Sequence, residues 1–258
     1  MCDHEPHPVR ADGGVSADAD EASEQLAAVE RPDTSPDHYT FGELPLEPVR
    51  PGTAVLVVSP AAVNDASHGM LAVGNPGEGI VGVAARTSPR RFLHSLSEHT
   101  DSPLVEPHIG VVGCMNSRTP RIHSFPEAHV RTVSSPADLT GLGMRFSDLQ
   151  NVVLDTIEER TQNSTRVRAC LDSLTVLDQY VESRTLYRFL NAFNGRTRAA
   201  DMLGIVTANR NAHDEREIGR FAGLFDGIVE IRETDSGLEC RVRGLSGQPR
   251  GWRPFPTR

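Results

Sequence analysis

The sequence predicts an α/β fold built on a mostly parallel sheet. From residue 53 onward, short runs of apolar, β-rich residues alternate with helical patterns, and this alternation is typical of βαβ units. The first run, 54–58, is apolar throughout, as expected of a central strand covered on both faces. Ser88 followed by Pro89 has the pattern of a helix N-cap and first helical residue.

The remaining elements follow in order along the chain. We expect strands at 79–85, 109–114, 130–133, 167–171, 202–207 and 227–231, and a strand at 238–242 that closes a C-terminal β-hairpin. We expect helices at 65–73, 90–98, 146–160, 176–193 and 214–221. The periodic spacing of apolar residues is clear in 176–193. The segment 134–143 is rich in turn-forming residues and predicts a link into the helix that follows.

The first 37 residues differ in composition from the rest of the chain. A length of 258 residues favours one folded domain. Residues 1–47 contain 12 acids and 2 arginines, a net charge of −10, and the rest of the chain has a net charge of +1. Residues 1–37 also have very few large apolar side chains. We therefore expect an acidic disordered tail at 1–37 and one domain at 38–258.

Composition excludes several classes of function. All 26 basic residues are arginine, which excludes a lysine Schiff base and the lysine of a phosphate-binding loop. Acidity with arginine in place of lysine is typical of salt-adapted organisms with GC-rich genomes. No apolar run approaches the roughly 20 residues of a membrane helix, and no signal pattern precedes the domain. We therefore expect a cytoplasmic protein without a membrane partner.

Asp172 closes the apolar run 167–171. In nucleotide-binding α/β folds, an acid at the carboxyl edge of the sheet can hold Mg²⁺ through water. An aspartate that caps the next helix or turn gives the same local pattern. Asp172 is thus a candidate metal-linked residue or a structural acid.

Several segments resemble the KaiC and RecA ATPase superfamily. The resemblance lies in the order of the strands, in Asp172-Ser173-Leu174 and in the segment 224–230. Segments 135–143 and 170–175 more narrowly resemble the haloarchaeal KaiC-like proteins. The similarity covers about residues 39–252. It implies a RecA-like three-layer sandwich with a mostly parallel central sheet, and ATP and Mg²⁺ as the ligands of active members.

The phosphate-binding loop of that superfamily, GxxxxGK[ST], is degenerate here. Placing Ser59 on the first glycine puts Asn64 on the second, Asp65 on the lysine and Ala66 on the Ser/Thr position. Asp65 brings negative charge beside a polyphosphate, and Ala66 lacks a metal-binding hydroxyl. These four positions are therefore candidate cofactor-binding residues of a site that has lost its phosphate contacts.

The resemblance also implies a catalytic glutamate at the end of the next strand. That segment reads Val-Ala-Ala-Arg-Thr-Ser at 83–88 and contains no acid. We expect Arg86 to pair with Asp172 or to cap a helix instead. The chain thus resembles a pseudo-ATPase with no catalytic residue and no bound cofactor.

Other polar groups give weaker signals. His94, Glu98 and His99 are expected on a surface helix, and His213 with Asp214 at a helix start. The segment 241–258 has five arginines, no acid, one tryptophan and one phenylalanine. Such a segment can bind nucleic acid through phosphates and stacking. It is also compatible with a hairpin whose arginines lie along the surface.

The function that the sequence favours is a non-catalytic, regulatory or signal-transduction module that acts through protein partners or as a homo-oligomer. One alternative is an ATP-binding protein with weak ATPase activity, in which Arg86, Arg90 or Arg91 replaces the lysine. Another is a DNA-associated recombinase relative that uses the C-terminal arginines.

Overall fold

The computed structural model describes Met1 and residues 38–63, 65–72, 74–75, 77–100, 103–114, 122–160 and 166–256. The predicted tail lies outside these residues, apart from Met1. The helices and strands belong to one unit, Thr34–Arg258. No helix among the described residues is long and apolar enough to cross a membrane.

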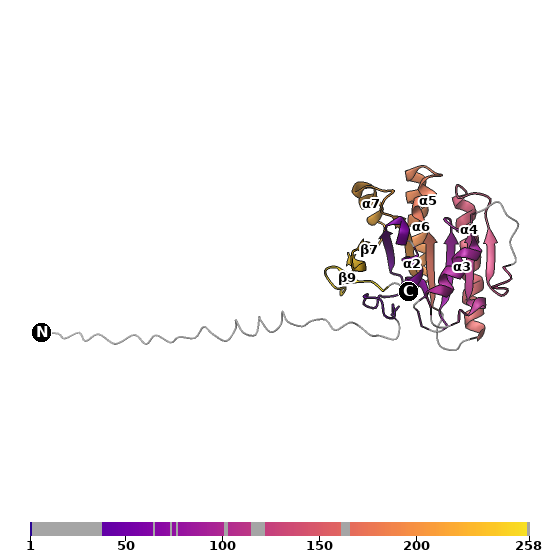
Figure 1. Cartoon of the computed structure of the whole chain (residues 1–258), viewed down its shortest axis with the longest axis horizontal. Coiled ribbons are helices and arrows are strands. Elements are labelled where there is room, and N and C mark those ends of the chain that lie inside the picture. Colours follow the sequence, from indigo (N-terminus) through magenta and orange to yellow (C-terminus); the bar gives the residue numbers. More distant parts are fainter. Residues whose placement is uncertain are drawn as a thin grey trace. The chain divides into compact units, whose positions relative to one another are not determined.

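The described strands form one sheet in the order β4-β3-β2-β5-β6-β1-β7-β8-β9 (Figure 1). The strands are β1 Ala54–Ser59, β2 Gly79–Ala84, β3 Ile109–Gly113, β4 His129–Thr132, β5 Val167–Asp172, β6 Leu203–Asn209, β7 Gly227–Thr234, β8 Gly237–Arg243 and β9 Arg253–Pro254. Strands β1 to β7 pair in parallel. Strands β7 and β8 form the predicted antiparallel C-terminal hairpin, and β9 pairs with β8.

Helices cover both faces of the sheet. They are α2 Ala66–Ala72, α3 Pro89–Glu98, α4 Leu139–Arg160, α5 Leu174–Asp178, α6 Ser183–Ala199 and α7 Glu215–Ala222, with 3₁₀ turns η1 Ala61–Val63 and η2 Glu106–His108. Residues of α4, α5, α6 and α7 pack in one buried cluster with Leu56 and Val58 of β1. Residues of α2, α3 and the segment 39–49 pack in a second cluster with Val55 and Val57. Because neighbouring residues of a strand point to opposite faces, the fold has three layers, and the predicted RecA-like α/β class is confirmed.

Two helices differ most from the sequence prediction. Helix α4 begins at Leu139 and not at residue 146, because the Asp138 carboxylate accepts a hydrogen bond from the backbone N–H of Gly141 (2.8 Å). Leu139 and Leu142 are buried in the core, so packing overrides the low helix propensity of the glycines. The helix predicted at 176–193 is two helices, because Glu182 adopts extended backbone angles ahead of α6.

Two predicted helix starts are confirmed. The Ser88 side chain accepts a hydrogen bond from the N–H of Arg91 at the start of α3. Asp214 and Glu217 form a capping box at the start of α7. Each cap satisfies backbone donors that the first helical turn leaves free.

Arg168 of β5 is buried completely and joins three parts of the domain. Its guanidinium donates to Glu78 (2.7 Å), to the carbonyl of Met70 (2.9 Å) and to the carbonyl of Thr40 (2.8 Å). It also lies over the ring of Tyr39, 5.5 Å from its centre. Arg168 therefore holds the segment 39–49 against the sheet.

Candidate functional site

The carboxyl ends of the parallel strands carry the predicted site residues. Ala84 at the end of β2 pairs with Asp172 at the end of β5, and β6 lies between β5 and β1. Open parallel sheets bind ligands outside this edge. The fold thus brings Ser59, Arg86 and Asp172 to the edge where a nucleotide site is expected.

Asp172 is fully buried at this edge. Its Oδ1 accepts hydrogen bonds from Thr207 Oγ1 (3.0 Å) and from Arg86 Nε (3.2 Å). Its Oδ2 lies 3.7 Å from Nε2 of His68, and neither of these two buried atoms makes a hydrogen bond. The carboxylate is therefore held by protein groups on one oxygen and faces an imidazole on the other.

Arg86 connects Asp172 with the loop that precedes α2. While its Nε donates to Asp172, its Nη2 donates to Oδ1 of Asp65 (3.0 Å). The backbone N–H groups of Ala85 and Arg86 also donate to the carbonyl of Asp172, at 2.6 and 3.0 Å. The predicted pairing of Arg86 with Asp172 is confirmed, and one guanidinium bridges two carboxylates.

Both members of the buried pair are charged. Burial raises the pKa of Asp172, but the neighbouring His68 ring and the Arg86 guanidinium lower it by more, so its pKa lies below the ordinary value. Burial lowers the pKa of Arg86, but Asp172 and Asp65 raise it by more, so its pKa lies above the ordinary value. The pair is thus an ion pair at neutral pH.

The described part of the loop after β1 offers few free backbone donors. Pro60 has no N–H. The N–H of Ala61 donates to Asn211 Oδ1 (3.4 Å) and that of Val63 to the carbonyl of Pro60 (3.1 Å). Ser59 is buried. Since phosphate cradles use free N–H groups, this segment contributes little to one. Asn64 and the side chain of Ala66 lie outside the described residues.

His68 belongs to the site, although no sequence pattern indicated it. It is buried on α2, its Nδ1 lies 2.6 Å from Oγ of Ser95, and its ring packs against the edge of Phe92 at 4.9 Å. Its partners are on α3 and β5, far away in sequence. A single histidine among small residues carries no local pattern that reveals such contacts.

One family model matches most of the chain, and its description names no activity. The family described as "Family of unknown function (DUF7504)" matches residues 52–231. The chain belongs to the DUF7504 family. No curated protein matches it.

Among solved structures, this DUF7504 chain is similar to the crystal structure of the KaiC-like protein PH0186 from the hyperthermophilic archaeon Pyrococcus horikoshii OT3. The two share 14% sequence identity, with a TM-score of 0.45. The match covers 74% of this chain and 77% of that one.

Two C-terminal arginines of the DUF7504 chain, Arg241 and Arg243, make contacts within the domain. Glu230 is buried at the end of the β1–β7 pairing and binds Arg210 (3.4 Å), Arg243 (2.8 Å) and Arg241. The Arg241 guanidinium also lies over the Trp252 ring, 4.6 Å from its centre. These contacts favour the packed hairpin over a free nucleic-acid patch.

The other histidines predicted as weak candidates have structural partners. Nδ1 of His99 lies 2.7 Å from the carbonyl of Ser95, and the His94 ring packs against Phe125. His213 is buried, not solvated, and its Nε2 lies 3.0 Å from Thr175 Oγ1. Among the described residues, no group of three or more His, Cys, Asp or Glu is placed to hold a metal.

Proposed function

We propose that this chain is a non-catalytic RecA/KaiC-like module whose nucleotide site is closed by an internal ion-pair bridge. The observation that carries the proposal is the position of Arg86, which binds Asp172 and Asp65 at once. Asp172 is the acid that resembles the magnesium-linked residue of active relatives, and Asp65 stands at the lysine position.

The bridge opposes the binding of Mg·ATP. A magnesium ion held through Asp172 would have to share that carboxylate with the Arg86 guanidinium, whose Nε lies 3.2 Å from Oδ1, and the two cations would repel each other. Displacing Arg86 would leave Asp172 buried without its cation, which is strongly unfavourable. Asp65 adds negative charge where the phosphates would lie.

The site also lacks a group that could activate water for hydrolysis. The segment 83–88, at and after the end of β2, contains no acid, whereas active RecA-like and KaiC-like enzymes carry a glutamate at the end of this strand. Both nearby carboxylates, Asp65 and Asp172, accept hydrogen bonds from Arg86. A carboxylate bound to a guanidinium is a weak base, so it contributes little to proton abstraction.

The setting that we propose follows the composition and the resemblance. Acidity with arginine and no lysine supports a haloarchaeal, cytoplasmic protein. A module without catalytic activity functions by binding other molecules at its surface. We therefore propose a regulatory or signal-transduction role through protein contacts or homo-oligomers.

One observation favours the alternative of nucleotide binding through arginine. A cavity of about 390 Å³ beside Asp65 is lined by Arg90 and Arg91 of α3. Within the described part of the chain, neither arginine is in an ion pair. The same cavity is also lined by Glu98, whose charge opposes a polyphosphate.

A phosphate-release assay tests the proposed loss of catalysis. With Mg·ATP in excess, the wild-type chain and the Asp172→Asn variant are expected to release phosphate at the same background rate, because Asp172 serves no bound metal. Release by the wild type that disappears in Asp172→Asn would refute the proposal. Release lost in Arg90→Glu and Arg91→Glu would favour the arginine alternative.

A further inference from the structure

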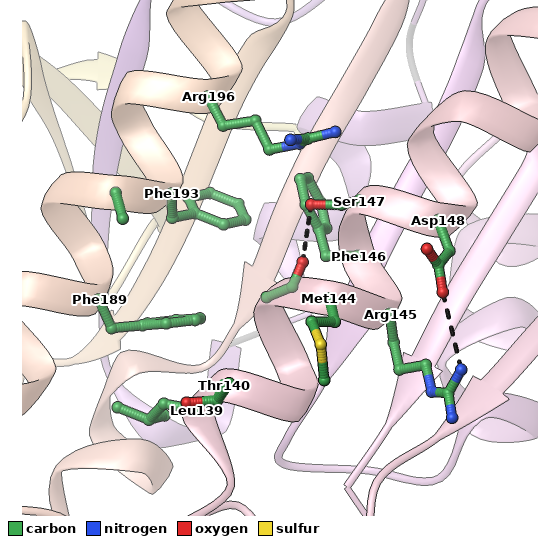
Figure 2. Close-up of a pocket in the computed structure, with 12 residues that line it drawn as sticks. Leu139, Thr140, Met144, Arg145, Phe146, Ser147, Asp148, Phe189, Phe193 and Arg196 are labelled. Atoms are coloured by element: carbon green, nitrogen blue, oxygen red, sulfur yellow. Dashed lines mark hydrogen bonds and ion pairs between the residues drawn. The ribbon is translucent and has the colours of Figure 1, made fainter.

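The outer surface of the domain has an apolar groove between α4 and α6. Its volume is about 680 Å³, and we call it the α4–α6 groove. Figure 2 shows Phe189 and Phe193 of α6 directed toward α4, which contributes Met144 and Phe146. Met144 is 59% exposed, so the groove presents a large apolar side chain to solvent.

The α6 side of the groove is basic. Helix α6 contains four arginines and no acid in 17 residues. Arg184, Arg188, Ala192 and Arg196 are spaced four residues apart, so they form one stripe along the helix, and the last two line the groove. Arg184 and Arg188 make no ion pair within the described residues.

The charged side chains that line the groove sum to a net positive charge. Arg196 donates through Nε to Gln150 Oε1 (2.7 Å), which is a neutral acceptor. Asp148 is the single acid among the lining residues, and it lies 3.6 Å from Arg145 on the same helix. The groove thus combines an apolar floor with a net positive rim.

We propose that the α4–α6 groove binds an acidic amphipathic segment of a partner protein. Apolar side chains of that segment contact Met144 and Phe189, and its carboxylates face the arginine stripe of α6. This inference deepens the proposed function, because it names the class of partner on which a non-catalytic module would act.

A protein segment fits the groove better than a nucleic acid does. Nucleic-acid sites follow a phosphate backbone with many cations and present aromatic rings to bases. Here the floor is formed by a methionine and packed phenylalanines, and two arginines line it. An apolar groove with few surrounding cations is typical of sites that bind an amphipathic helix.

The test measures the fluorescence anisotropy of a labelled 16-residue peptide titrated with the full chain. The peptide has leucine at helical spacing i, i+3, i+4 and i+7 and glutamate on its other face. We expect saturable binding that weakens by about tenfold in Arg188→Glu and in Met144→Glu, the size of a typical interface hot spot. A peptide with lysine in place of every glutamate is expected not to bind.

Matched controls lie on the other side of the sheet or away from the groove. Arg90→Glu on α3 makes the same charge change as Arg188→Glu, and Val105→Glu changes another exposed apolar residue. Equal binding of the acidic and basic peptides, equal loss in Arg90→Glu, or tighter binding of a 12-nucleotide single strand would overturn the proposal. The phosphate-release assay is independent, so its result stands whichever peptide outcome is found.

Discussion

Replacing Arg86 by methionine should lower the free energy of unfolding by about 3–5 kcal/mol, the cost of removing one partner of a buried ion pair. The variant leaves the Asp172 carboxylate fully buried, with Thr207 as its remaining side-chain hydrogen-bond donor. Urea denaturation at pH 7 measures the loss. Because the pKa of Asp172 is lowered in the folded state, the stabilisation is present at neutral pH and is lost as the pH falls below about 4.

Two further variants separate the stability that the Arg86–Asp172 contact contributes from that of the more exposed Arg86–Asp65 contact. Asp65→Asn removes the half-exposed ion pair with Arg86 and keeps a side chain of similar size, so we expect a loss of less than about 1 kcal/mol. Arg86→Met combined with Asp172→Asn should recover part of the loss, since an amide is cheaper to bury than an unpaired charge. If Arg86→Met and Asp65→Asn lower the free energy of unfolding equally, the Arg86–Asp172 contact contributes nothing to stability.

Arg168→Met is expected to cause a loss of similar size, about 3–5 kcal/mol. The change leaves Glu78 without its closest cation at 2.7 Å and two buried carbonyls without their donor. It also removes one of the hydrogen bonds that hold the segment 39–49 against the sheet. Thermal unfolding followed by circular dichroism measures the effect.

Arg166→Met is the matched control for Arg168. Arg166 is on the same strand end but is partly exposed, and its guanidinium lies 3.8 Å from Glu78, so a smaller loss is expected. If the two variants lose the same stability, the buried hydrogen bonds of Arg168 do not have the role assigned to them.

The sheet could be predicted from the sequence because each central strand is a short apolar run. Helix ends were harder to predict, since they depend on contacts that the local sequence does not contain. The glycines at 141 and 143 favour a loop, but burial of Leu142 extends α4 through them. The break before α6 was missed because apolar residues keep helical spacing on each side of it, within 176–181 and within 186–193.

The site was predicted in part for a similar reason. Arg86 and Asp172 follow neighbouring parallel strands, so their meeting could be expected from strand order. His68 and Thr207 approach Asp172 from other elements, and nothing in their local sequence indicates this. The α4–α6 groove was not foreseen, because the predicted helix began at residue 146, after Met144, whereas α4 begins at Leu139.

Calorimetric titration of Mg·ATP into the wild-type chain tests the central claim most directly, because binding requires the bridge of Arg86, Asp65 and Asp172 to open. We expect no saturable heat at millimolar nucleotide, at low or high salt. Saturable binding that is weakened by Asp172→Asn would contradict the account, since it would mean that the bridged site still holds a nucleotide.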